Sequence, residues 1–275
     1  TQFFSAAKLV RANGMLEGST IVAILLGVVL GGKMADRSLD TAFVGIIVLY
    51  ALAASANLLI PRLPPEHRLD ALRPAVLVRD FVGALKILFG HRDTRFSLLG
   101  TSLFWGSGTT LRLLLFAWVP VALAIDNNGT PANLMGVVSV GIVVGASLAS
   151  WLINLEKVNR ALIGGLLLGP LVIGLAFVHD MTTCVILLVS IGASGGLFVV
   201  PLNALLQERG HESVGAGHAL AVQNLCENTV MLLFIGLYSF ATHVGVPVIP
   251  TVAGFGAVVA VGIAILAAAL LRRVL

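Results

Sequence analysis

Eight apolar runs, each long enough to cross a bilayer, take up most of this chain of 275 residues. A hydrocarbon core about 30 Å thick needs roughly 20 apolar residues in a helix. Backbone groups in lipid must be satisfied internally, and runs of this length indicate helices rather than barrel strands. The sequence therefore predicts an all-α integral membrane protein. The runs lie approximately at residues 14–35, 41–60, 96–122, 132–153, 161–178, 182–206, 215–241 and 249–271.

The composition supports the same class of protein. Hydrophobic residues make up 58% of the chain and charged residues only 11%, whereas a soluble domain is about one quarter charged. The formal charge of +4 does not indicate nucleic-acid binding, because the basic residues are scattered over short loops. Cys184 and Cys226 both lie inside apolar runs, which favours two small packed side chains over a disulfide or a metal site.

The placement of lysine and arginine predicts the orientation. Cytoplasmic loops carry an excess of these residues, and seven of them lie in the one long polar segment, 61–95. With that segment in the cytoplasm, both ends of this chain are also cytoplasmic. Fourteen of the 17 basic residues then lie inside, against Lys33 and Arg37 outside, with Arg112 alone in the membrane.

The long polar segment contains a predicted amphipathic helix at residues 74–90. Its apolar positions Leu77, Phe81, Leu85 and Leu88 recur at helical spacing. One interpretation is a helix that lies on the inner leaflet and contacts anionic lipid. The other is a linker helix packed between two helical bundles.

Glycine pairs four residues apart predict close helix contacts. They are Gly27 with Gly31, Gly141 with Gly145, Gly165 with Gly169, and Gly192 with Gly196. Small residues at this spacing let two helix backbones approach each other in lipid.

Arg112 is the first candidate functional residue, because it lies deep inside the third run. A charge at the centre of a span costs about 3 kcal/mol on insertion scales. A guanidinium is always charged and can bind phosphate or carboxylate through two hydrogen bonds. An ion pair or a side chain that reaches out to the interface are the structural alternatives.

The seventh run contributes a polar flank near its middle. Gln223 and Glu227 are four residues apart, as are Asn224 and Asn228, so we expect all four on one flank of a helix. Polar groups facing lipid are costly, and this flank should therefore face protein or a water-filled cavity. An interhelical hydrogen-bond seam is the structural alternative, and whether Glu227 pairs with Arg112 stays open.

Two further polar residues are candidate ligands. Glu17 opens the first run near the cytoplasmic surface, where the helix dipole would favour a carboxylate in any case. Asn203 follows Pro201 toward the inner end of its run, and a bend there would either shape a gate or only serve packing.

Enzyme motifs are missing from the sequence. HEXXH, GXSXG and phosphate-binding-loop patterns do not occur, and the histidines are not clustered as metal ligands. We therefore expect no catalytic residues, no metal and no cofactor. Any transport would depend on a gradient or be passive.

Four long segments resemble bacterial lysophospholipid transporters of the major facilitator superfamily. They begin KLVRANGMLEG, DTRFSLLGTSLFWGSG, FVVPLNALLQERGHES and GVPVIPTVAGFGA, and the resemblance extends from about Lys8 to the C-terminus. It implies a fold of twelve transmembrane helices in two six-helix halves. Residues 1–60 would then be the last two helices of the N-terminal half, 61–95 the cytoplasmic loop, and 96–275 the C-terminal half. The first four of the twelve helices are expected to be absent.

The resemblance also implies a role. The family moves lysophospholipids, chiefly lysophosphatidylethanolamine, across the bacterial inner membrane to the cytoplasmic leaflet. A cytoplasmic acyltransferase–acyl carrier protein synthetase then restores the second acyl chain. The residues fit such a substrate, because Arg112 could bind its phosphate while Glu227, Gln223 and Asn224 accept hydrogen bonds from its ammonium.

Two alternatives stay open at this point. A drug or small-solute efflux carrier is favoured if Glu227 couples transport to protons. A membrane scaffold for a lipid-modifying enzyme is disfavoured, because a scaffold has no need for costly polar groups at depth.

Overall fold

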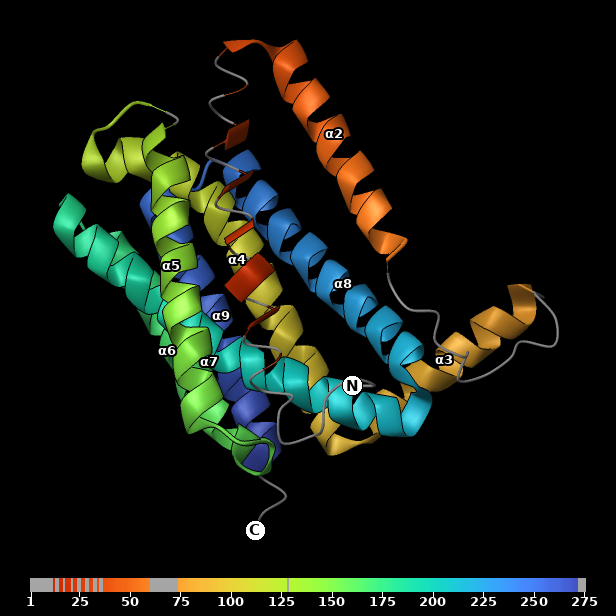
Figure 1. Ribbon diagram of the computed structural model, residues 1–275. Helices are drawn as coiled ribbons and strands as arrows, with labels where there is room; N and C mark the ends of the chain where they lie inside the picture. Colours follow the sequence, from red (N-terminus) through yellow and green to blue (C-terminus); the bar gives the residue numbers. More distant parts are fainter. Residues whose placement is uncertain are drawn as a thin grey trace.

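In the computed structural model (Figure 1), every element of the described chain is helical. The description covers residues 37–59, 74–127 and 129–271, together with single residues and short pieces between 12 and 34. The predicted all-α class is confirmed for these residues. The first predicted run, 14–35, is described only in single residues and short pieces.

Seven of the described helices are long and apolar enough to cross a membrane, so the count of eight stays a prediction. The helices are α2 (Leu39–Asn57), α3 (Pro74–Gly90), α4 (Arg92–Leu123), α5 (Gly129–Leu152), α6 (Ala161–Gly174), α7 (Met181–Val214), α8 (Ala216–His243) and α9 (Val248–Leu271). Short 3-10 turns, Leu155–Arg160 and Leu175–Phe177, flank α6.

Two helices are much longer than the apolar runs that predict them. α4 has 32 residues and α7 has 34, which correspond to about 48 and 51 Å at 1.5 Å per residue. Both continue through polar residues at the cytoplasmic end predicted from the basic loops, because backbone hydrogen bonding does not stop where hydropathy falls. Gly215, with φ of 82°, then separates α7 from α8. A side chain would be strained in that backbone conformation.

Glycines hold α5 and α7 in close backbone contact. A Cβ added at Gly141 would collide with the Val189 carbonyl oxygen of α7, and one at Gly192 with the Val138 carbonyl oxygen of α5. Gly145 and Gly196 continue the same seam. The spacing of these two glycine pairs in the sequence therefore predicted the close contact between α5 and α7 correctly.

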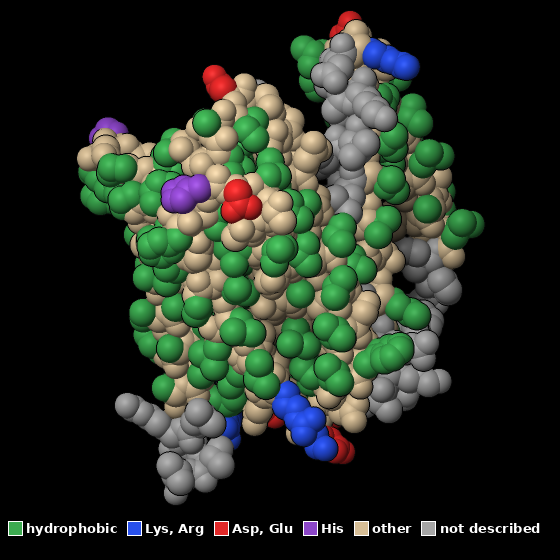
Figure 2. Space-filling view, turned by 90° about the vertical axis from the view of Figure 1, so that its left-hand side faces the viewer, with side chains coloured by type: hydrophobic (Ala, Val, Ile, Leu, Met, Phe, Trp, Pro, Cys, Tyr) green, Lys and Arg blue, Asp and Glu red, His purple; other side chains and the backbone are tan. Residues whose placement is uncertain are grey.

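The core is apolar and lies where α4, α6, α7 and α9 meet. Trp118, Phe198 and Leu188 are among its fully buried side chains. On the face shown in Figure 2, charged and histidine side chains gather near the two ends, and a wide band between them carries hydrophobic and small side chains. Such a band fits the hydrocarbon of a bilayer.

The two helices before α4 differ in how they join this core. No residue of α2 is buried, and Figure 1 shows it outside the bundle. α3 begins and ends at the residues predicted from the sequence, and its Ala84 and Leu88 are buried against α4, α7 and α8. The C-terminal part of α3 is thus a packed linker helix.

Candidate functional site

The exposed side of α4 lies between α5 and α8. On one side, Gly106 of α4 lies against Val230 and Phe234 of α8. On the other side, Gly108 of α4 lines a small cavity together with Val138 of α5. Figure 1 likewise shows α4 between α5 and α8.

Arg112 lies on this exposed side of α4, one turn after Gly108, and its side chain is exposed. Within the described part of the chain, it forms no ion pair or hydrogen bond. It lies eleven residues before the C-terminal end of α4 at Leu123, or about 16 Å from that end. The guanidinium is therefore available to a ligand on this side of α4.

A hydrogen-bonded amide and carboxylate cluster connects α7 to α8. The Gln223 Nε2 atom donates one hydrogen bond to Asn203 Oδ1 (2.9 Å) and another to Glu227 Oε1 (2.8 Å). Asn203 and Gln223 are buried, and Glu227 is half-buried. Gln223 thus uses both N–H groups of its amide, and the Glu227 carboxylate is held in a fixed position.

Thr101 adds a third helix to this cluster. Its side chain is fully buried on α4 and lies beside the Glu227 carboxylate, while its hydroxyl donates to the Leu98 backbone oxygen of its own helix (3.3 Å). Our sequence analysis missed Thr101, because a lone threonine in an apolar run usually bonds to its own helix. Its eleven-residue spacing from Arg112 was a usable signal, since eleven residues make about three turns and place both on one side of α4.

The structure separates the two charged candidates along α4. Glu227 lies at the level of Thr101, so Arg112 is eleven residues farther toward the C-terminal end of α4, a rise of about 16 Å. No ion pair between Arg112 and Glu227 exists among the described residues. This answers the question that the sequence left open. One short ethanolamine headgroup cannot span both groups in this conformation.

The structure divides the predicted flank of four polar residues into two pairs on α8, so that only one pair joins the cluster. Gln223 and Glu227 point into the cluster, whereas Asn224 and Asn228 are exposed on the neighbouring side. The Asn228 Nδ2 atom donates to the Asn224 backbone oxygen (2.7 Å). The physical reason is the turn of about 100° between successive residues, which moves the second pair out of the cluster. Glu17 lies outside the described residues.

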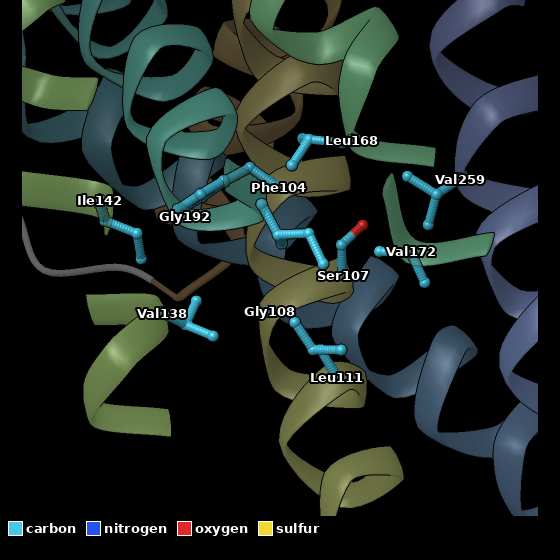
Figure 3. A pocket seen from close by; sticks show the side chains of 11 residues that line it. Phe104, Ser107, Gly108, Leu111, Val138, Ile142, Leu168, Val172, Gly192 and Val259 are labelled. Carbon is cyan, nitrogen blue, oxygen red and sulfur yellow. The ribbon is translucent and has the colours of Figure 1, made fainter. Parts of the chain in front are cut away.

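A small cavity inside the bundle is not a lysolipid site (Figure 3). It has a volume of about 50 Å³ and a wall of apolar side chains except for Ser107. The Ser107 hydroxyl donates to the Leu103 backbone oxygen of its own helix (2.6 Å). Liquid water occupies about 30 Å³ per molecule, so this cavity has no room for an acyl chain.

A larger hollow lies between α5 and the described pieces of residues 15–26. Its volume is about 760 Å³, and apolar side chains such as Leu26 and Trp151 line it together with Ser147 and Ser150. Ligand pockets for small molecules usually measure about 300–1,000 Å³. Among the described residues, no group of three His, Cys, Asp or Glu side chains could hold a metal ion.

Comparisons with known proteins agree on one family. A model of the Major Facilitator Superfamily matches residues 1–235. The chain is 50% identical to the lysophospholipid transporter LplT of Escherichia coli O1:K1 and 52% identical to that of Salmonella arizonae, in each case over 259 residues or 94% of the chain. The chain spans 65% of the length of these relatives.

Proposed function

The chain belongs to the major facilitator superfamily, and within it we propose that the protein transports lysophospholipids and is not an enzyme. The proposal adopts the substrate named for relatives that are half identical over nearly the whole chain. The structural observation that best supports it is the exposed guanidinium of Arg112 in a membrane-spanning helix. Among the described residues, this guanidinium has no ion-pair or hydrogen-bond partner.

Arg112 binds the phosphate in this proposal. Every lysophospholipid carries a phosphodiester, and a guanidinium can donate two parallel hydrogen bonds to it. The position of the arginine along α4 places it within the membrane, and its side chain is exposed on the surface of the bundle. A charge in that place is costly unless it has a partner or water, and the lipid phosphate supplies the partner.

The cluster of Asn203, Gln223 and Glu227, called the inner cluster below, forms a second binding site for the headgroup. Glu227 is bonded to Gln223 and lies beside Thr101, about 16 Å inward of Arg112. An ammonium group pairs with a carboxylate, so an ethanolamine headgroup engages Glu227 after leaving Arg112. Gln223 and Asn203 position this carboxylate. Asn224 and Asn228 lie on the neighbouring side of α8 and line the route rather than the cluster.

The single acyl chain stays in apolar surroundings during the passage. The hollow beside α5, with its mainly apolar wall and its volume of about 760 Å³, is within the size range of ligand pockets. A lysolipid can therefore move its polar head along α4 and α8 while its tail remains against α5 or in lipid.

The direction, membrane and partners follow from this proposal. The basic segment 61–95 favours a cytoplasmic loop and cytoplasmic ends of this chain in the bacterial inner membrane. We infer transport of lysophosphatidylethanolamine to the cytoplasmic leaflet. A cytoplasmic acyltransferase–acyl carrier protein synthetase is then the enzyme class that would consume the product.

Uptake of labelled lysophosphatidylethanolamine tests the function. The protein and its Arg112→Ala variant are compared in membrane vesicles at equal levels of inserted protein. We expect Arg112→Ala to lower uptake at least about tenfold, because a hydrogen bond between charged groups contributes about 1.5–3 kcal/mol. Leu113→Ala is the matched control, since Leu113 is also exposed on α4 and has no charge.

Other results would change the assignment. Equal uptake by Arg112→Ala and the parent protein would remove Arg112 from the headgroup path. No lysolipid uptake by the parent protein, together with efflux of an organic cation, would favour the efflux carrier. The half-buried Glu227 carboxylate is the observation that keeps that second candidate.

A further inference from the structure

α3 has an apolar face that the bundle covers at only one end. Two rows of apolar residues run along this face, one through Leu77, Phe81, Ala84 and Leu88 and the other through Val78, Val82, Leu85 and Phe89. Positions that differ by three, four, seven or eleven residues lie on the same side of a helix. The C-terminal members of both rows are buried or packed against Leu98, Leu206 and Val222.

None of the described residues covers the N-terminal end of this face. Leu77, Val78 and Val82 are 39%, 62% and 40% exposed. Figure 1 shows that this part of α3 projects away from the bundle beside α8. Three neighbouring apolar side chains on one face of a charged helix are unusual if they face water.

The packing of α3 places it at the level of the membrane boundary. Leu98 of α4 and Leu206 of α7, which it contacts, lie at the inner ends of the apolar runs 96–122 and 182–206. Val222 of α8 lies six residues inside the start of its helix, or about 9 Å. α3 is therefore beside the ends of the hydrocarbon-spanning segments and not below them.

The opposite side of α3 carries basic residues next to the uncovered apolar end. Arg79 and Lys86 are seven residues apart and share that side. The Arg79 side chain is 80% exposed and has only Asp80 within ion-pair distance (3.7 Å) among the described residues. An apolar face bordered by basic residues is the pattern of helices that lie in a membrane interface.

We propose that the N-terminal half of α3 is a lipid-binding surface for the inner leaflet. Leu77, Val78 and Val82 insert at the boundary of the acyl chains, and Arg79 and Lys86 bind the headgroups of anionic phospholipids. Negative charge is the chemistry that these two cations recognise, and anionic lipids are its source at this level of the membrane. The proposal rests on the cytoplasmic placement of residues 61–95 and is independent of the transported substrate.

Two spin-labelled variants of the protein in lipid nanodiscs test the contact. Val78→Cys places a label on the apolar face, and Gly83→Cys places one on the polar side, where an added Cβ meets open space. We expect the Val78 label to be relaxed mainly by oxygen, which concentrates in lipid, and the Gly83 label mainly by a water-soluble nickel complex. The parent protein measures background labelling, since Cys184 is buried and Cys226 half-buried.

Two results would overturn the lipid contact. Equal access of the nickel complex to both labels would mean that α3 lies in water. A Val78 label that is immobile and reached by neither agent would mean that protein covers this face.

The choice of anionic lipid has its own test. In nanodiscs with phosphatidylglycerol added to phosphatidylcholine, we expect the region around Val78 to be enriched in phosphatidylglycerol. Arg79→Gln combined with Lys86→Gln should reduce this preference on the order of tenfold. An unchanged preference would refute the role of the two cations. Labelling of Gly83→Cys by a membrane-impermeant maleimide in inverted but not right-side-out vesicles checks the orientation separately.

Discussion

Two polar positions on one side of α4, Thr101 and Arg112, differ in how the protein satisfies them. Toward the N-terminal end, Thr101 meets a carboxylate that is already bonded to Gln223, which in turn bonds to Asn203. About 16 Å farther along the same side, Arg112 is exposed and has no bonded partner among the residues that the structure describes.

This difference separates residues that hold the helices together from a residue that is available to bind a ligand. A buried polar network that is fully satisfied fixes how its helices pack, so the inner cluster holds α4, α7 and α8 together whether or not a ligand is present. An unpaired cation in a membrane span contributes nothing to that packing and is costly. We therefore expect the inner cluster to affect both stability and transport, and Arg112 to affect transport almost alone.

Headgroup selectivity should give the largest effect. Glu227→Gln keeps an oxygen that accepts from Gln223 but removes the charge that pairs with an ammonium. We expect it to lower transport of lysophosphatidylethanolamine about tenfold and to leave lysophosphatidylglycerol nearly unchanged. Arg112→Gln should lower both, because both lipids carry a phosphate. Competition between the two labelled lipids in vesicles measures this ratio directly.

Equal losses of both lipids in Glu227→Gln would contradict a headgroup role for this carboxylate. That result would instead assign Glu227 to ion coupling, which acts on every substrate alike.

The stability of the inner cluster should show the next largest effect. Gln223→Leu removes two hydrogen bonds and leaves Asn203 and Glu227 without this donor. Interhelical hydrogen bonds in membrane proteins contribute about 0.6–1.7 kcal/mol each, so we expect a loss of about 1–3 kcal/mol. Thermal unfolding in detergent, followed by circular dichroism, measures it. Leu225→Ala is the control, because Leu225 lies on the exposed side of the same helix.

Arg112→Ala should have the smallest effect on stability. An exposed side chain without partners changes the free energy of unfolding by less than about 0.5 kcal/mol. The same thermal experiment measures it beside Gln223→Leu. A loss of unfolding free energy as large as that of Gln223→Leu would show that Arg112 contributes to packing. The difference between Arg112 and the inner cluster would then disappear.

Much of the fold could be predicted from the sequence, because lipid reduces the choices of the backbone. Hydropathy predicted eight runs, and seven of them are long apolar helices in the described part of the chain. Helical spacing gave the bounds of α3. Hydropathy did not give the ends of α7, which continues from 206 to Val214 through polar residues. Hydropathy reports where the solvent changes, whereas a helix ends where its hydrogen bonds do.

The candidate site was only partly predictable. The contact between Gln223 and Glu227 follows from their spacing of four residues. The contacts with Asn203 and Thr101 join helices that are far apart in sequence, and no local pattern specifies which helices become neighbours. The separation of Arg112 from Glu227 depends on the relative height of α4 and α8, which pack closely where Gly106 meets Val230, and no local sequence pattern gives this height.

The glycine seam between α5 and α7 has a mechanical consequence. Because carbonyl oxygens of each helix occupy the space where the other lacks side chains, neither helix can slide or roll without striking backbone atoms. We therefore expect α5 and α7 to move together as one rigid unit. A change in helix arrangement beside α4 would then come from tilting of α8, whose buried residues are few, relative to this pair.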